Sequence, residues 1–321
     1  MEITTDATTQ AGGAPPVGGT PVAAVHPHRH ISRLMILPGV VLLLLLVLFP
    51  VVMEIYISLT TWTPTTGTQW YSAYRNWTWF TNYWDGLTSP SFLTAVLRTI
   101  VITAAATGVE FLLGFGLALL FLEKFLGRQV ATVLFLIPMM IVPAVSGFVF
   151  YLLLQTTGPV NTILSAILPG TVEARWLTDP TLTPISVVIV DIWQWTPLMF
   201  LILLAGLMAV PEDQIQAADI LGASWAQKLR HVVLPIMKPI ILIALIIRAM
   251  EAFKIFDAAW LLTTGGPGEA SSTISVKLYR EAFQNSEWSY VAALAIVVMI
   301  LVSVAASQAI KPLERRQEGS P

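Results

Sequence analysis

The sequence predicts an all-α polytopic membrane protein, and two observations support this fold class. Hydrophobic residues make up 55% of the 321 residues and charged residues only 11%, against about 25% charged in an average soluble domain. This balance leaves too little polar surface to cover a globule, so lipid must form part of the solvent. The apolar residues also fall into long runs, as expected for helices that need about 20 residues to cross the hydrocarbon layer.

Six of these runs are long enough to be membrane spans. The first, residues 34–53, has no charged residue and is too long and too far into the chain to be a signal peptide. The other five are residues 92–122, 130–154, 182–209, 236–263 and 288–310. We therefore expect one six-helix membrane domain over residues 31–311, with a cytoplasmic C-terminal tail at 312–321.

Residues 1–30 are rich in Thr, Gly, Ala and Pro and have no hydrophobic period, which predicts a disordered tail. His26, His28 and His30 raise the alternative of a metal site, but Pro27 interrupts them, and we expect no metal. The chain has no cysteine, which excludes disulfides and thiolate sites. Its net charge of -2 gives no basic field for nucleic acid as a partner.

The distribution of Lys and Arg predicts the orientation in the membrane. If the N-terminus is inside, ten of these residues lie in inner connections and four in outer ones, which favours two cytoplasmic termini in a multi-pass protein of the cytoplasmic membrane. The inner residues are Arg29, Arg33, Lys124, Arg128, Lys228, Arg230, Lys238, Lys311, Arg315 and Arg316, and the outer residues are Arg75, Arg175, Lys277 and Arg280.

The first outer loop is dense in aromatic residues. They are Trp62, Trp70, Tyr71, Tyr74, Trp77, Trp79, Tyr83 and Trp84. Their amphipathic rings suit the interface between membrane and water, and we favour this interpretation. The alternative is that the loop binds sugar rings or a docking protein.

A polar segment, residues 210–235, separates the fourth and fifth spans. It opens with Pro211, Glu212 and Asp213, a pattern typical of a helix start because proline fits the first turn and acidic residues oppose the helix dipole. One stripe then repeats at spacings of three and four: Ile215, Ala218, Gly222, Trp225 and Leu229. These features predict one amphipathic helix along the cytoplasmic surface, after which Pro235 and Pro239 begin the next span.

Two interpretations of this helix are open. It either floats in the headgroup layer or docks into a groove of another protein. Gly222 favours docking, because glycine inside a helix costs about 1 kcal/mol relative to alanine and helps only where a backbone approaches closely or the helix bends.

The same segment resembles the cytoplasmic EAA loop of permease subunits of binding-protein-dependent ABC importers. In that family, Glu-Ala-Ala is followed, after three intervening residues, by Gly, and then, after nine residues, by Ile-x-Leu-Pro. The matching positions here are Ala217, Ala218, Gly222, Val232, Leu234 and Pro235. Two positions depart from the family pattern: the signature Glu is Gln216, and the Asp often found before the Gly is Leu221.

Further stretches resemble the sugar branch of this family, the maltose and trehalose type permeases. They are LLTTGGPG at 261–268, DIWQWTPLMFLILLAGLMAVPED at 191–213 and LFLIPMMIVPAVSGFVF at 134–150. The resemblance implies ATP-driven import of an oligosaccharide, disaccharide or polyol, with Trp225 on a coupling helix. It also implies four kinds of partner: a second homologous permease, two ATP-binding subunits, an extracytoplasmic sugar-binding protein or lipoprotein, and membrane lipid.

The chain itself is not expected to be an enzyme or to bind a cofactor. It has no GxxxxGK[ST] phosphate loop, so ATP and Mg belong to the partner subunits. Two other classes stay open. An ion-coupled secondary transporter or channel would need no coupling helix, and a membrane enzyme would need a nucleophile or metal set, whereas His231 stands alone.

Arg248, Glu251, Lys254 and Asp257 follow one another at intervals of three in the fifth span. Neighbours at this spacing share a helix face, and an isolated charge at the bilayer centre costs at least about 2.5 to 3.5 kcal/mol. The charges either form a self-neutralising ladder or line a substrate path. We favour the path, because similar permeases bind sugar near this position and Trp260 offers a flat face to a pyranose.

The fourth span contributes a second polar group, Asp191 and Gln194. Asp191 should have a partner, and Gln194 lies on nearly the same face. Path lining and helix packing are equally supported by the sequence. Arg98, near an outer end, is expected to snorkel to the interface, and Glu110 carries little information.

Overall fold

The computed structural model describes residues 29–317, with side chains for residues 36–311. In this range the backbone forms helices and irregular connections, and β pairing is limited to an isolated bridge between Thr60 and Trp77. Residues 1–28 of the predicted N-terminal tail, with His26 and His28, lie outside the described residues, as does the end of the C-terminal tail. The last two residues of the predicted N-terminal tail, Arg29 and His30, belong to a helix, and the side chain of His30 is not described.

The chain divides into two compact units, Met1–Val51 and Val52–Pro321. Helix α1 (Arg29–Ser58) begins in the first unit, and its segment Ile36–Ser58 is long and apolar enough to cross a membrane. Side chains 36–50 are exposed within the chain. An uncharged surface of this length requires lipid or another protein around it.

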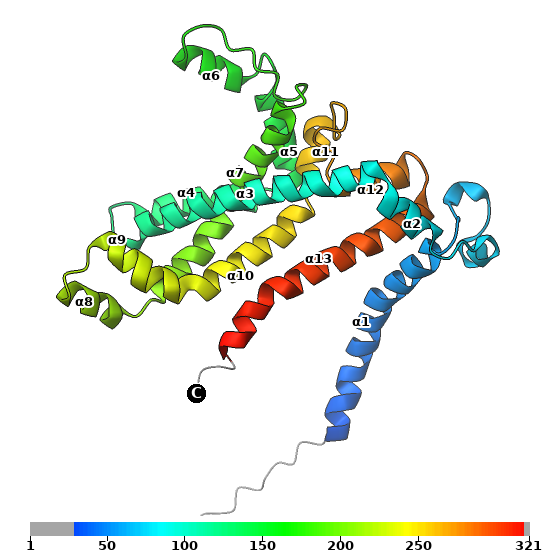
Figure 1. The fold of residues 1–321 in the computed structure, drawn as a ribbon, viewed down its shortest axis with the longest axis horizontal. Helices are drawn as coiled ribbons and strands as arrows, with labels where there is room; N and C mark the ends of the chain where they lie inside the picture. Colours follow the sequence, from blue (N-terminus) through cyan, green and yellow to red (C-terminus); the bar gives the residue numbers. More distant parts are fainter. Residues whose placement is uncertain (1–28, 318–321) are drawn as a thin grey trace, which may run out of the picture. The chain divides into compact units, whose positions relative to one another are not determined.

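Three further predicted spans are single helices, and each helix contains the apolar segment that the sequence predicts as a span. They are α3 (Pro90–Leu122), α7 (Leu182–Met208) and α13 (Trp288–Gln317). Each contains a segment that can cross the membrane by length and composition. Figure 1 shows α3, α10 and α13 as long helices in the second unit.

The predicted span at 130–154 is not one helix. It consists of α4 (Arg128–Met140) and α5 (Pro143–Leu153), which are bent by 95° at the break between them. Pro138 near the end of α4 and Pro143 at the start of α5 remove backbone donors, which explains why the helix stops here. The described residues thus contain five candidate spans, and six if the bent pair is counted as one.

The fifth span ends at Thr263 as predicted, but it differs from the prediction at its start and contains a break. It begins before Pro235, because α9 (Trp225–Lys228), the π turn η3 (Leu229–Val233) and α10 (Leu234–Phe253) follow without interruption. It is then interrupted after Phe253, and α11 (Asp257–Thr263) completes it. The prolines therefore do not begin a separate helix as predicted: Pro235 directly follows the π turn, in the first turn of α10, and Pro239 lies inside α10.

Short helices form the connections. They are η1 (Pro64–Thr66), η2 (Trp70–Asn76), α2 (Thr81–Thr88), α6 (Pro159–Ile167), α8 (Glu212–Ile220) and α12 (Ile274–Phe283). In the aromatic loop, Trp70, Tyr71, Tyr74, Trp79 and Trp84 are exposed. Interface anchoring by this loop stays a prediction.

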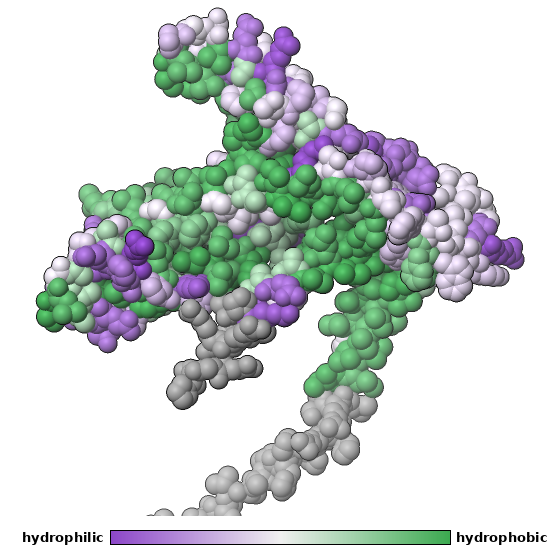
Figure 2. Space-filling model, in the orientation of Figure 1, coloured by the Kyte–Doolittle hydropathy of each residue, from purple (hydrophilic) through white to green (hydrophobic). Residues whose placement is uncertain are grey.

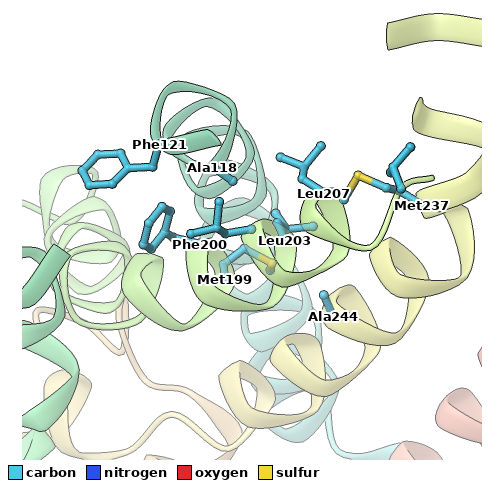
Figure 3. Packing of buried hydrophobic residues seen from close by; sticks show 10 residues of the cluster. Ala118, Phe121, Met199, Phe200, Leu203, Leu207, Met237 and Ala244 are labelled. Carbon is cyan, nitrogen blue, oxygen red and sulfur yellow. The ribbon is translucent and has the colours of Figure 1, made fainter. Parts of the chain in front are cut away.

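The main apolar core lies where α3, α7 and α10 meet. Figure 3 shows its residues: Ala118, Phe121, Met199, Phe200, Leu203, Leu207, Met237 and Ala244. Helices in lipid associate through close packing rather than through the hydrophobic effect. Gly114 allows this packing, because a Cβ there would lie 3.0 Å from the backbone nitrogen of Phe200.

Polar residues gather at two places in the second unit. Figure 2 shows hydrophilic residues over α8 and α9, and again around α12, with the hydrophobic surfaces of α3, α10 and α13 between them. An apolar band between polar ends is the expected pattern for a bundle that crosses a bilayer.

Candidate substrate path and coupling loop

A buried ion cluster joins three helices at the centre of the bundle. Arg248 of α10 lies between Glu110 of α3 and Asp191 of α7. Its Nε is 2.6 Å from Glu110 Oε2, and its Nη2 donates to Glu110 Oε1 at 2.8 Å and to Asp191 Oδ2. The three residues are 2%, 0% and 5% exposed. Nη2 thus donates a charge-assisted hydrogen bond to each carboxylate, while Nε lies within ion-pair distance of Glu110 without forming a hydrogen bond.

The cluster corrects the expected ladder, because Arg248 pairs with acids on other helices and not with Glu251. Asp191 has the partner that the sequence analysis required, and Glu110 supplies a second acid that the sequence analysis set aside. The ring of Trp195 also lies 5.4 Å from Arg248 Cζ, close enough for a cation–π contact. An acid in an apolar span needs a partner. The role of Glu110 could therefore have been predicted for the same reason as that of Asp191.

Gln194, also on α7, stabilises the break between α4 and α5. Its Nε2 donates to the carbonyl oxygen of Ile141 at 2.8 Å, and the side chain is 3% exposed. Ile141 caps α4, so its carbonyl lies beyond the regular helix. Buried carbonyls require a partner, and in this conformation Gln194 provides it.

Two of the three remaining charges of the expected ladder form a separate, exposed pair. Lys254 Nζ lies 2.9 Å from Glu251 Oε1, and the side chains are 63% and 52% exposed. Asp257 is half-buried in the first turn of α11, where a negative charge is favoured by the helix dipole. The structure therefore separates Arg248, buried in the bundle, from three charges around the break at 254–256.

Trp260 of α11 belongs to an aromatic cluster. Its ring is parallel to that of Phe256, with centroids 5.8 Å apart and an interplanar angle of 12°. Tyr279 of α12 contacts both rings, at 5.1 Å from Phe256 and 4.8 Å from Trp260. Tyr279 was not predicted from the sequence, although Tyr279 and Phe283 are four residues apart and share one face of α12.

Two arginines fix the connection between α11 and α12. Arg280 Nη2 donates to the carbonyl oxygen of Thr264 at 2.7 Å, and Arg98 Nη1 donates to that of Ser272 at 2.9 Å. Arg98 was expected to snorkel to the interface, and instead it binds α3 to this connection. The aromatic cluster is thus held beside a hydrogen-bonded loop.

The coupling loop begins as predicted and then departs from the prediction. Helix α8 starts at Glu212 with Pro211 at its N-cap and Glu212 and Asp213 in its first turn. It ends at Ile220, and Gly222 follows with φ +73°. The expected helix through Gly222 is therefore wrong. The glycine is needed because a left-handed residue ends the helix and leads into the next one.

Helix α9 begins immediately after this turn. Ser224 and Gln227 form a capping box, in which each side chain bonds to the backbone of the other residue. An ion pair between Asp219 and Lys228, 2.6 Å long, joins the two sides of the turn. The turn is consequently held in one shape by contacts on both sides of Gly222.

The residues predicted to couple to an ATPase divide over this turn as a result. Ala218 is half-buried, whereas Gln216, Ala217 and Gly222 on the α8 side and Trp225 on the α9 side are exposed. Leu234 and Pro235 lie in the first turn of α10, beyond the π turn. The expected single stripe is therefore split. Ile220 and Leu221 are each 86% exposed and Trp225 is 62% exposed, so the turn presents an apolar tip.

Comparisons with known proteins agree with this arrangement. Residues 110–318 match the family described as "Binding-protein-dependent transport system inner membrane component". The trehalose/maltose transport system permease protein MalF of Thermococcus litoralis is 32% identical over 85% of this chain and 90% of its own length. The trehalose transport system permease protein SugA of Mycobacterium tuberculosis is 35% identical over 70% of this chain and 71% of its own length.

The fold is also shared with a solved structure. A bacterial ABC transporter involved in the import of the acidic polysaccharide alginate contains a chain that matches with a TM-score of 0.74 and 22% identity, over 89% of this chain and 96% of that one. The family match, the two relatives and the membrane-spanning bundle lead to one conclusion: this chain belongs to the multi-pass inner-membrane components of binding-protein-dependent transport systems.

Proposed function

We propose that this chain is the permease subunit of an ATP-driven importer that carries an oligosaccharide, a disaccharide or a related polyol. The observation that carries the proposal is the exposed turn between α8 and α9, which is joined to a membrane span by an uninterrupted helix. The carbohydrate class rests on the relatives named for trehalose and maltose transport. An extracytoplasmic binding protein or lipoprotein delivers the substrate.

The coupling turn transmits motion to the centre of the bundle. From Trp225 to Arg248 the helix covers 23 residues, or about 35 Å at 1.5 Å per residue. A displacement of the turn by an ATPase subunit therefore reaches Arg248, and through its two carboxylates it reaches α3 and α7. Two ATP-binding subunits supply ATP and Mg, and a second, homologous permease completes the membrane part.

The substrate path runs past the break between α10 and α11. Phe256 and Trp260 present parallel rings, and Lys254, Glu251 and Asp257 place donors and acceptors nearby. A sugar suits this set, since each hydroxyl both donates and accepts and the apolar ring face packs on aromatic side chains. Arg248, Asp191 and Gln194 hold the helices around the path.

Both chain termini lie in the cytoplasm in this proposal, which places the α8–α9 turn on the same side as the ATPases. The apolar tip formed by Ile220, Leu221 and Trp225 then enters a groove on an ATPase. Because Gln216 and Leu221 stand where the family pattern has acids, shape and apolar contact carry more of this docking than charge does.

Substitution of Gly222 tests the docking assignment. A left-handed conformation costs an L-residue about 1 to 2 kcal/mol, and a leucine also adds bulk at the tip. We expect Gly222→Leu to lose ATPase co-purification and at least about tenfold of substrate uptake, since 1.4 kcal/mol corresponds to a factor of ten. Gly222→Asn is the matched control, because asparagine tolerates this conformation.

Normal ATPase co-purification and normal uptake by Gly222→Leu would contradict the docking assignment. A second measurement separates this importer from an ion-coupled transporter or channel. Uptake by membrane vesicles should stop when ATP is removed and should be unaffected when ion gradients are collapsed. Uptake that follows the ion gradient and persists without ATP would favour the secondary transporter.

A further inference from the structure

A groove on the first part of α10 combines two cations with an apolar floor. Its volume is about 450 Å³. It is lined by Arg230, Leu234, Pro235, Lys238, Ile241 and Leu242. All of these residues come from one continuous helix, and the two charged residues lie at the end where that helix enters its apolar run.

The π turn brings the two cations to the same side of the helix. In a regular α-helix, positions eight apart are rotated about 80° from one another. Here the N–H of Leu234 donates to the carbonyl oxygen of Leu229, five residues back, so this turn contains one additional residue. The additional residue removes most of that rotation, and Arg230 and Lys238 both face the groove.

No acid neutralises these two cations within the part of the chain whose side chains are described. Lys228 pairs with Asp219 and Arg248 with Glu110 and Asp191, whereas Arg230 and Lys238 form no ion pair. Between residues 220 and 250 the sequence contains four Lys or Arg residues and no Asp or Glu. The groove therefore carries a net positive charge that an anionic group would complement.

We propose that this groove binds the headgroup of an anionic phospholipid, with an acyl chain along its apolar floor. A guanidinium binds phosphate through two parallel hydrogen bonds, and a lysine adds a point charge. Basic pockets at the ends of membrane helices are suited to such headgroups. Leu234, Ile241 and Leu242 continue the groove toward the hydrocarbon layer, which suits a lipid better than a free phosphate ion.

The test titrates lipid onto the complete transporter, purified with its partner subunits and stripped of lipid, and counts bound molecules by native mass spectrometry. Removing both cations by Arg230→Gln with Lys238→Gln should weaken phosphatidylglycerol binding about 30-fold, because each cation contributes about 1 kcal/mol to binding. The single change Lys238→Gln should weaken it about fivefold. The matched control, Lys124→Gln with Arg128→Gln, should leave it unchanged, and phosphatidylcholine should bind equally to all.

Three results would overturn the proposal. Equal phosphatidylglycerol affinity in the single variant, the double variant and the unaltered chain would remove the site. Loss of an ATPase subunit from the double variant, with lipid binding retained, would assign the groove to a protein partner. Displacement of phosphatidylglycerol by millimolar inorganic phosphate would assign it to a free anion.

Discussion

Arg248 and Lys254 are cations of the same predicted helix face, six residues apart, and the fold uses them in opposite ways. Arg248 is buried between two carboxylates from α3 and α7. Lys254 is exposed and pairs only with Glu251, three residues before it. Spacing along one helix thus indicates which charges are neighbours, but the opposite helix decides which charges pair.

The two environments imply different energies. A charge on an isolated span is costly, so Arg248 and its two carboxylates depend on one another. Removing one of the three charges leaves the others buried without compensation. The exposed pair of Lys254 and Glu251 contributes only about 0 to 1 kcal/mol, because solvent screens it. This difference predicts where a substitution affects folding and where it affects only transport.

Removing the buried cation should give the largest effect. Arg248→Ala leaves Glu110 and Asp191 facing each other without a cation, and we expect the free energy of unfolding to fall by about 3 to 5 kcal/mol. Thermal unfolding of the purified complex in detergent measures this loss. Uptake should fall with it, because α3, α7 and α10 are no longer tied together.

Two variants check the cause of that loss. Arg248→Lys keeps the charge but not the two-pronged contact, so its stability should lie between those of the alanine variant and the unaltered chain. Combining Arg248→Met with Glu110→Gln and Asp191→Asn removes all three charges and should restore part of the stability. The comparison fails if Arg248→Ala unfolds at the same temperature as Lys254→Ala.

Gln194 gives an intermediate case, a buried neutral group. Gln194→Leu leaves the carbonyl of Ile141 without its donor, which should cost about 1 to 3 kcal/mol and increase hydrogen exchange around the break at 141–142. Thr196→Val is the matched control, because the Thr196 hydroxyl bonds only to Ile192 within α7. Equal exchange in the two variants would contradict a role for Gln194 at the break.

How much of this structure could be predicted differs by region. The spans at α3, α7 and α13 can be predicted from apolar runs alone. A single segment that crosses lipid must form a helix, because only a helix lets its backbone N–H and C=O groups hydrogen-bond to one another. The breaks after Met140 and Phe253 were not predicted, although Pro138 and Pro143 gave a signal for the first. Composition within one segment cannot reveal that Gln194 of another helix donates to the carbonyl oxygen of Ile141 at this break.

The site shows the same limit. Gly222 was identified from its unusual position in a polar stretch, but the physical reason was misassigned, since a left-handed turn and not a bend inside a helix requires it. A partner for Asp191 was expected because an unpaired charge in a membrane span is costly. That the partner is Arg248 depends on how α10 packs against α7. Tyr279 was missed because it reaches Trp260 only through the loop between α11 and α12.

Substitutions at the exposed charges should have the smallest effect on folding and a distinct effect on transport. Lys254→Ala and Asp257→Ala should each change the free energy of unfolding by less than about 1 kcal/mol, since these side chains are not fully buried. If the path runs past them, uptake should weaken while the complex stays intact. Uptake kinetics and co-purification of the partner subunits measure the two quantities separately.

Lys311→Ala serves as a control of equal charge, because Lys311 is exposed, lies near the far end of α13 and bonds only to Gln308. Its uptake should match that of the unaltered chain. Unchanged transport in both Lys254→Ala and Asp257→Ala would return these charges to a purely structural role. The path would then have to be sought at the aromatic cluster, where Trp260→Ala removes one of the two parallel rings without changing any charge.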